Sequence, residues 1–291
     1  MSDAVRVGLV GAGPWAALVH APVLAAGPST RLAGVWARRP EAAAALADRH
    51  HVPAFDALEA LFDACDVVAC CVPPDVQAEI AIEAAGAGKH LLLEKPIAAD
   101  LPAAERLAGA IREAGVRSLV VLSWRYSAAV RSFLERSAGF GALGGRGHFV
   151  SGALLGGMFA TPWRLERGPL LDLGPHVIDL LDAALGRVTA VEARGDRLGW
   201  VGLLLEHEGG AVSEASLCAT AAIEPHRSGV ELYGRGGVLE IDCAAAVGPE
   251  AFATLTAELA ATVRSGEDHP LDVERGLHLQ RLIADAERQL G

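Results

Sequence analysis

The sequence has few cysteines and no long apolar run. Its five cysteines form no C-x-x-C pair, which favours buried thiols in a reducing compartment over disulfides or a zinc site. No stretch approaches the roughly 20 apolar residues that span a bilayer. No basic segment precedes the first apolar stretch, which therefore predicts a strand rather than a signal peptide. We expect a cytoplasmic protein that does not bind a membrane.

Basic residues are also in deficit. The 291 residues include 25 Lys and Arg against 36 Asp and Glu, for a formal net charge of −11. This balance argues against nucleic acid or an anionic membrane surface as the main partner. The hydrophobic content of 52% is sufficient for a core and argues against disorder. The length favours two modest domains over one large domain.

Residues 1–122 alternate short β-rich runs with alanine-rich helical segments. Strands are expected in "VRVGLVGAG", "TRLAGVWARR", "CDVVACCVPP", "HLLLEKP" and "SLVVLS". These runs do not alternate apolar with polar residues, as expected of strands that helices cover on both faces. The pattern predicts βαβ units and an α/β fold with a doubly wound parallel sheet, a Rossmann domain.

The sequence pattern changes over residues 123–291. Successive strands with glycine-rich turns are expected there, together with a helix at "GPLLDLGPHVIDLLDAALG" and two helices near the end. This order predicts an α+β domain with an open, largely antiparallel sheet.

The motif GAGPWA follows the first expected strand and opens a helix. In a G-x-G-x-x-A loop, Gly11 allows a tight turn, Gly13 lets a pyrophosphate approach the backbone, and Ala16 allows close helix–strand packing. The strand–turn–helix context favours dinucleotide binding over an ordinary turn. The residues expected to bind the dinucleotide here are Gly11, Gly13, Pro14 and Trp15.

Two arginines, Arg38 and Arg39, follow the second expected strand. A site selective for NAD usually has an acidic residue at this point for the ribose 2′-hydroxyl, and "VWARRP" has none. Guanidinium groups could instead pair with the 2′-phosphate of NADP. The alternative is a solvated pair at a helix start. NADP is therefore the first expectation for the cofactor and NAD the alternative.

Glu94 and Lys95 end the fourth expected strand, directly before Pro96. Side chains at the carboxyl end of a strand in a doubly wound sheet face the ligand crevice. Taken alone, a lysine at a strand end is usually just solvated. The motif therefore needs support from elsewhere in the chain.

That support comes from "DLGPHVID", which spaces Asp172, His176 and Asp179 four and three residues apart. If the segment is helical, these side chains share one face, although Pro175 costs a helical hydrogen bond. A carboxylate beside an imidazole suits general-base chemistry. The alternative is a pair that only stabilises the helix by charge.

Together these motifs resemble the Gfo/Idh/MocA family, named for glucose–fructose oxidoreductase, inositol dehydrogenase and rhizopine catabolism. The resemblance covers nearly the whole chain and rests on "GLVGAGPWA", "GKHLLLEKPIA", "PWRLERGPLLDLGPHVIDLL" and "VELYGRGGVLEI". It implies a Rossmann domain over residues 1–122 and a substrate-binding domain over residues 123–291, whose open sheet commonly forms a dimer or tetramer interface. It also implies an active site between the domains.

The resemblance also implies roles for single residues. Lys95 would contact both cofactor and substrate, Asp172 would bind a substrate hydroxyl, and His176 would be the catalytic acid or base. Trp163 and Arg164, in "TPWR", match positions near the nicotinamide half of the cofactor.

Other positions concern the cofactor crevice, which Pro73 and Pro74 would line and which Glu94 would join. The chain departs from the family pattern at Gln77, where many members have a histidine, and this leaves contacts on the cofactor side open. At 291 residues it is also shorter than most relatives, so loops of the second domain must be trimmed.

We therefore expect an NAD(P)-dependent oxidoreductase that transfers a hydride between nicotinamide and a secondary alcohol or ketone of a sugar, cyclitol or related small molecule. One alternative is reduction of a non-sugar C=O, C=N or C=C bond. The apolar residues Leu154, Leu155, Met158 and Phe159 would suit such a substrate, but they could equally be strand core. Another alternative is a non-catalytic sensor or scaffold that binds a dinucleotide.

Overall fold

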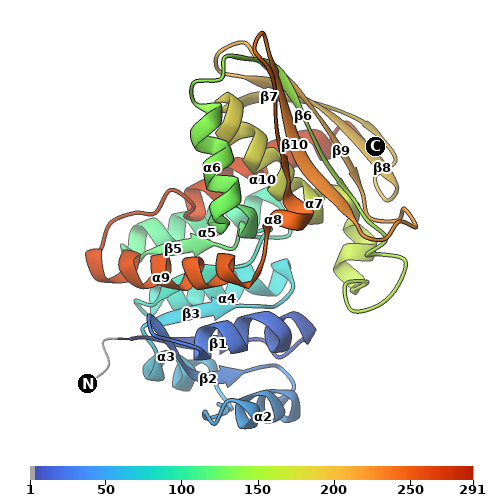
Figure 1. The fold of residues 1–291 in the computed structure, drawn as a ribbon. Helices are drawn as coiled ribbons and strands as arrows, with labels where there is room; N and C mark the ends of the chain where they lie inside the picture. The colour runs from blue at the N-terminus through green and yellow to red at the C-terminus, as the bar shows by residue number, and fades with distance from the viewer. Residues whose placement is uncertain (1–3, 291) are drawn as a thin grey trace. The chain divides into compact units, whose positions relative to one another are not determined.

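The computed structural model describes residues 4–290, and the chain divides into two compact units (Figure 1). The first unit contains the chain up to Val121 and the segment Phe252–His278. The second contains Leu122–Ala251 and the chain from Leu279 onward. The first boundary thus lies one residue before the expected one.

The segment Phe252–His278 corrects the expected division, which placed all of residues 123–291 in the second domain. This segment packs beside the last strand of the first unit. Val120 N donates a hydrogen bond to Leu271 O at 2.7 Å, and Val273 N donates to Ser118 Oγ at 3.0 Å. The chain therefore returns to its first unit after it has built most of the second.

The first unit is built on a five-stranded parallel sheet with the order β2-β1-β3-β4-β5. Its strands are β1 (Val5–Val10), β2 (Thr30–Trp36), β3 (Val67–Cys70), β4 (His90–Leu93) and β5 (Ser118–Val120). All five expected strands are present, and the doubly wound prediction is confirmed. The strand order reverses between β1 and β3, and ligands of such sheets bind outside the carboxyl ends at that point.

The helices between these strands are α1 (Ala21–Ala25), α2 (Pro40–Arg49), α3 (Leu58–Ala64), α4 (Pro74–Gly86) and α5 (Leu101–Ala114). Two later helices, α9 (Pro249–Ser265) and α10 (Val273–Glu287), each extend into both units. In α5, the Asp100 side chain accepts from Ala103 N at 2.9 Å, and Gly115 ends the helix at φ 65°. Pro102 in the first turn of α5 has no N–H to leave unpaired, and glycine adopts the left-handed conformation at a helix end without strain.

The first connection differs from the expected single helix. A π-helix, Ala16–His20, precedes α1. A π-turn closes with i→i+5 hydrogen bonds, so residues five apart lie about one turn apart. The consequence for Trp15 and His20 is described with the site below.

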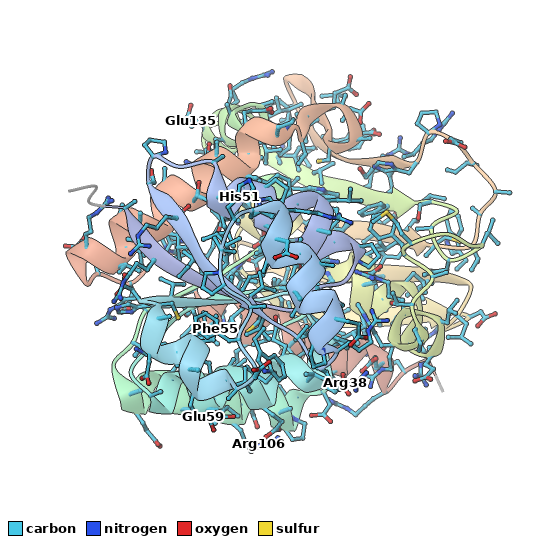
Figure 2. The ribbon with its side chains drawn as sticks, turned by 90° about the horizontal axis from the view of Figure 1, so that it is seen from below. Arg38, His51, Phe55, Glu59, Arg106 and Glu135 are labelled. Carbon is cyan, nitrogen blue, oxygen red and sulfur yellow. The ribbon has the colours of Figure 1, made fainter. Side chains whose placement is uncertain are left out.

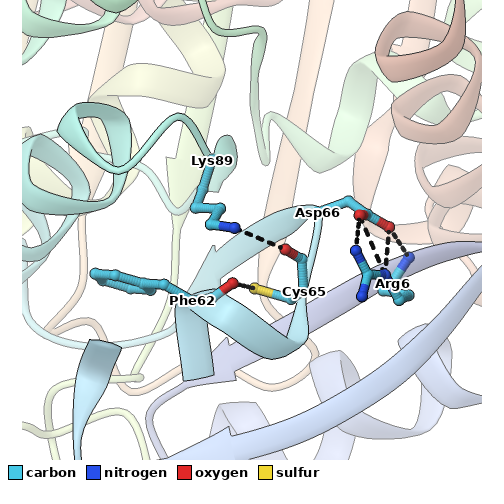
Figure 3. Close-up of polar contacts among 5 residues, drawn as sticks. All are labelled: Arg6, Phe62, Cys65, Asp66 and Lys89. Carbon is cyan, nitrogen blue, oxygen red and sulfur yellow. Dashed lines mark hydrogen bonds and ion pairs between the residues drawn. The ribbon is translucent and has the colours of Figure 1, made fainter. Parts of the chain in front are cut away.

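The amino-terminal ends of β1, β3 and β4 are tied together by polar contacts (Figure 3). The Arg6 guanidinium pairs with the Asp66 carboxylate, and Arg6 N also donates to it at 3.0 Å. Lys89 Nζ donates to Cys65 O at 3.3 Å. These contacts lie at the end of the sheet opposite the glycine loop.

The second unit is built on a six-stranded sheet with the order β11-β10-β6-β9-β8-β7. Its strands are β6 (Ala142–Val150), β7 (Val188–Gly195), β8 (Trp200–His207), β9 (Val212–Cys218), β10 (Arg227–Gly234) and β11 (Gly237–Asp242). Only β6 and β9 pair in parallel, so the sheet is mixed and mostly antiparallel, as expected.

One face of this sheet is covered by α7 (Pro162–Leu185). A Cβ added to Gly147 of β6 would lie 2.6 Å from the Val177 side chain, so the helix lies directly on the strand. Alternate residues of β8, such as Val201, Leu203 and Leu205, are buried. The unit also contains the 3₁₀ helix η2 (Ser123–Tyr126), α6 (Ala128–Ser137) and α8 (Cys243–Ala246).

Residues 151–161 form a connection between β6 and α7 with no strand. The expectation that its apolar residues are strand core is therefore wrong. Leu154 is buried, whereas Leu155 and Met158 are exposed. Over residues 4–290, no helix has the length and apolar character needed to cross a membrane.

Candidate active site

The glycine loop follows β1 at the carboxyl edge of the first sheet. Gly11 has φ +114°, and a Cβ there would lie 2.2 Å from Cys71 O, directly after β3. A Cβ on Gly13 would meet no atom within 4 Å. Gly11 is thus required by the close approach of two strand ends, whereas Gly13 leaves open space above the backbone. Both features suit a dinucleotide pyrophosphate.

Arg38 and Arg39 lie after β2, at the amino end of α2, and both are exposed. Figure 2 shows α2 between Arg38 at its beginning and His51 beyond its end. The structure places no carboxylate in the three residues Ala37–Arg39 that follow β2. These side chains are available to a phosphate, as the sequence predicts, but their binding role stays a prediction.

Pro73 and Pro74 follow β3 and start α4. Pro73 is the N-cap residue, and Pro74 occupies the first helical position, where its missing N–H costs nothing. Pro73 is exposed and Pro74 is buried. Both lie at the carboxyl edge of the sheet that the glycine loop shares, so their predicted place beside the cofactor is consistent with the topology.

Glu94, directly after β4, is held by two side chains from the π-helical segment. Trp15 Nε1 donates to Glu94 Oε1 at 2.9 Å, and His20 Nε2 approaches the same oxygen at 2.7 Å. Trp15 and His20 are five residues apart, and the π-turn lets both reach one carboxylate. The Trp15 ring also packs edge-on against Phe252, with centroids 6.3 Å apart.

This cluster carries opposite charges in a buried place. Burial by itself lowers the pKa of His20, but the Cys71 side chain and the Glu94 carboxylate outweigh it and raise the pKa to about 10. For Glu94, burial acts to raise the pKa, and the hydrogen bond and charge of His20, with the charge of Lys95, lower it. The pair is therefore a carboxylate and an imidazolium at neutral pH.

Lys95 follows Glu94, and its peptide bond to Pro96 is cis. Its backbone N donates to Glu94 Oε2 at 3.2 Å. Gln77 of α4 holds the backbone on both sides of it, through hydrogen bonds to Glu94, Pro96 and Ile97. Gln77, where many members of the family that the sequence resembles have a histidine, is thus a buried residue that supports the Lys95 segment.

In the second unit, the helix that carries the other predicted residues begins earlier than expected and is kinked. The break is at Gly168, with φ 74° and ψ −170°, where a Cβ would lie 2.2 Å from Arg197 O. Pro175 does not interrupt the helix, since Gly168 is its only non-helical position. Asp172, His176 and Asp179 all lie in the helical part after the kink and are buried.

Asp172 and Asp179 of α7 have different neighbours. Asp172 Oδ1 pairs with Arg164 Nε at 3.1 Å, and the Arg164 guanidinium lies over the Trp163 ring, 4.5 Å from its centroid. Asp179 accepts from Arg125 Nη1 with both oxygens at 3.1 Å. The structure therefore brings the predicted residues Trp163, Arg164 and Asp172 into one cluster.

His176 stacks on an aromatic ring that the sequence did not single out. Trp124 of η2 lies against it with centroids 5.3 Å apart and planes at 23°. Phe149 of β6 lies against the Trp124 ring at 5.6 Å, and His226 lies against Phe149 at 5.4 Å. This stack limits how the imidazole of His176 can turn, which a proton-transfer residue requires.

The contributors to these clusters that were missed from the sequence include His20, Trp124, Phe149 and His226. The partners described above for these four lie between 25 and 77 residues away, so α-helical spacing does not reveal them. For Trp124, the tryptophan of "SWRY" directly after the last strand of the first unit was the available signal.

Comparison with known proteins adds independent information. Residues 5–122 match the model described as an oxidoreductase family with an NAD-binding Rossmann fold, and residues 141–240 match the GFO/IDH/MocA C-terminal domain. The chain is 31% identical over 262 residues to a dTDP-3,4-didehydro-2,6-dideoxy-α-D-glucose 3-reductase of Streptomyces violaceoruber, covering 82% of this chain and 73% of the relative.

A second relative is levoglucosan dehydrogenase of Pseudarthrobacter phenanthrenivorans, 30% identical over 135 residues. That match spans 44% of this chain and only 35% of the relative. A solved levoglucosan dehydrogenase in complex with NADH superposes with a TM-score of 0.88 at 19% identity, covering 98% of this chain and 96% of that structure. This likeness supports the fold.

Proposed function

The chain belongs to the Gfo/Idh/MocA oxidoreductase family, and on that premise we propose that it transfers a hydride between a nicotinamide dinucleotide and a secondary alcohol or ketone of a sugar, cyclitol or related small molecule. The observation that carries the proposal lies in the first unit. Lys95 follows β4 at the same sheet edge where the glycine loop follows β1. A lysine at this edge can reach the oxygen of a substrate bound beside the cofactor.

The chain's own residues handle the proton. A ring nitrogen of His176 takes the proton of the substrate hydroxyl during oxidation, while Lys95 Nζ donates a hydrogen bond to the same oxygen and stabilises its developing negative charge. Asp172 binds a substrate hydroxyl. The Trp124 ring keeps the His176 imidazole in one plane. When bound, the nicotinamide supplies the hydride acceptor or donor.

For cofactor choice we propose NADP, with NAD as the alternative. Support comes from the exposed Arg38 and Arg39 after β2 and from the lack of a carboxylate there. A fluorescence titration with NADPH and NADH tests it. The proposal is supported if the protein binds NADPH more tightly than NADH and if Arg38→Ala and Arg39→Ala weaken NADPH binding. It is refuted if NADH binds as tightly as NADPH or more tightly.

The test of the reaction is turnover on a panel of sugars, cyclitols and nucleotide-linked sugars, run in both directions. Lys95→Ala and His176→Ala should abolish turnover and leave cofactor binding within a few-fold. Lys89→Ala is the matched control because Lys89 is the only other lysine and lies before β4, at the opposite sheet edge. Full turnover in both site variants would refute the assignment, and no turnover across the whole panel would favour a sensor or scaffold.

We also propose that a second copy of the chain covers the open face of the six-stranded sheet. The residues of this face alternate with those that α7 buries. They include the exposed apolar side chains Trp200, Leu204, Val212, Tyr233 and Val238. Light scattering of Trp200→Glu tests the idea: the wild type should be a dimer or tetramer and the variant smaller, whereas a monomeric wild type would refute it.

A further inference from the structure

Gln77 is fully buried and its side-chain amide binds the backbone that carries Lys95. Its Oε1 accepts from Glu94 N at 2.8 Å. Its Nε2 lies 2.8 Å from Glu94 O, 3.1 Å from Pro96 O and 3.1 Å from Ile97 O. From this geometry we infer that Gln77 is a positioning residue that holds Lys95 in place for the reaction, an inference that rests on the proposed function.

The Gln77 amide supplies backbone hydrogen bonds just beyond the point where the pairing of β4 with β3 ends. β3 ends at Cys70 and β4 at Leu93, so the strand pairing of β4 with β3 does not continue to Glu94. Gln77 both accepts from and donates to Glu94, as a peptide group of a neighbouring strand would. The extra contacts to Pro96 and Ile97 extend this pairing past Lys95.

The helix start explains how Gln77 reaches this point. Pro73 and Pro74 turn the chain from β3 into α4, and Gln77 N donates to Pro73 O at 2.8 Å in the first turn. Gln77 therefore lies at the carboxyl edge of the sheet. The chain between Gln77 and Glu94, 17 residues apart, consists of the rest of α4, a short turn and β4.

Glu94, the residue before Lys95, is held by a second set of hydrogen bonds in addition to those of Gln77. Trp15 and His20 hold the Glu94 carboxylate, whereas Gln77 holds the Glu94 backbone. Lys95 is the next residue, and the carbonyls on both sides of it are acceptors for Gln77. The two sets of hydrogen bonds together hold the backbone on both sides of Lys95.

Few side chains could do the work of Gln77. The position needs an acceptor and a donor on one planar group at the end of two methylenes. Asparagine is one methylene shorter, and an ionised carboxylate lacks the donor. A protonated carboxyl has both, and a neutral imidazole has one of each. Because Gln77 is buried, water cannot replace a lost partner, and each backbone group left without its hydrogen bond destabilises the turn.

The variants follow from this requirement. Gln77→Leu removes every side-chain hydrogen bond of this position. Gln77→Glu keeps the acceptor and regains one donor only when its carboxyl is protonated, and Gln77→His keeps part of the hydrogen bonds. Glu79→Gln on the same helix is the matched control, because Glu79 makes only an exposed pair with Arg106.

Kinetics give the first readout. Using a panel substrate that the wild type turns over, Gln77→Leu should lower kcat roughly 10- to 100-fold, as expected for a misplaced catalytic group. The dissociation constant for NADPH should stay within about three-fold, since the side-chain hydrogen bonds of Gln77 go to the backbone of Glu94, Pro96 and Ile97 rather than to the glycine loop. The ratio of Gln77→Glu kcat to wild-type kcat should rise as the pH falls from about 9 to about 6, because burial beside carbonyl oxygens favours the protonated carboxyl. The neighbouring ionisable groups His20, Cys71, Glu94 and Lys95 are the same in both proteins, so the ratio isolates the introduced carboxyl.

The second readout needs no substrate. The sequence contains just two lysines, Lys89 and Lys95. Reductive methylation with ¹³C-formaldehyde therefore labels only these and the chain's amino terminus. In Gln77→Leu the Lys95 signal should shift or broaden while the Lys89 signal, from the opposite end of β4, stays unchanged. Glu79→Gln should move neither.

Each outcome decides the inference. A Gln77→Leu protein with unchanged kcat and an unchanged Lys95 signal would overturn it, and so would a Gln77→Glu ratio that does not depend on pH. If Gln77→Leu fails to fold, the Gln77→Glu and Gln77→His proteins carry the same two readouts. Turnover retained in Lys95→Ala would instead refute the proposed function, while the Lys95 signal would still show whether Gln77 positions that residue.

Discussion

Replacing His20 with glutamine should change how stability depends on pH. Gln can still donate a hydrogen bond toward Glu94, but it carries no charge. In the folded chain the pKa of His20 is raised from 6.5 to about 10 by the Cys71 side chain and Glu94, against the opposing effect of burial. A raised pKa stabilises the fold fully below the unfolded value, and this stabilisation is lost as the pH rises through the folded value.

The magnitude follows from the shift. One pKa unit corresponds to about 1.36 kcal/mol, so a shift from 6.5 to about 10 has an upper limit of roughly 5 kcal/mol. Between pH 6.5 and pH 9 about 3 kcal/mol of this should disappear. The difference in free energy of unfolding between the wild type and His20→Gln should therefore decrease by about 3 kcal/mol from pH 6.5 to pH 9.

The measurement is amide hydrogen exchange of β1 and β4, because these strands report on the unit that contains His20. The control is His90→Gln. Burial and, secondarily, the charge of Arg117 lower the pKa of His90. The contribution of His90 to the free energy of unfolding is thus present above pH 6.5 and lost at lower pH. The difference in that free energy between wild type and His90→Gln should therefore be nearly constant between pH 6.5 and pH 9.

Imidazole NMR gives the direct check on His20. Its ring should stay protonated through neutral pH. A His20 ring that titrates near 6.5, or a His20→Gln difference that stays constant from pH 6.5 to pH 9, would refute the buried ion pair with Glu94.

Three further predictions concern stability. Gly11→Ala should destabilise the first unit by roughly 3 kcal/mol or more and abolish dinucleotide binding, because its Cβ would lie 2.2 Å from Cys71 O at φ +114°; an unchanged melting temperature would contradict this. Asp179→Asn should cost about 3–5 kcal/mol, since it leaves the charge of Arg125 without its buried carboxylate, and urea denaturation measures it. Arg106→Ala removes only an exposed pair and should change the free energy of unfolding by less than about 1 kcal/mol, so a loss above 2 kcal/mol would show that exposed pairs matter more here.

Much of the first unit could be predicted from local patterns. The buried runs of β1, β3 and β4 lack polar alternation because helices cover both faces of a parallel sheet. The glycine loop after β1 was recognisable because a tight turn and a close approach both require glycine. The order of strands and helices then implies that the strand ends share one edge.

Other features depend on contacts between distant segments. The pairing of Trp15 and His20 with Glu94 requires a π-turn, whose five-residue spacing does not match the 3.6-residue period by which helices are predicted. The return of residues 252–278 to the first unit depends on how this segment packs beside β5, and nothing in its own amphipathic pattern names that partner.

The sequence by itself therefore determined the strands and most of the helices of the first unit, the carboxyl edge of its sheet and the residue types present there, because these follow from neighbours along the chain. Only the tertiary structure decided that Gln77 supports the turn at Lys95, that Trp124 orients His176, and that Arg164 pairs with Asp172. Hydrogen bonds and ring contacts of this kind need atoms within a few ångströms, and only the packing of complete elements brings such residues together.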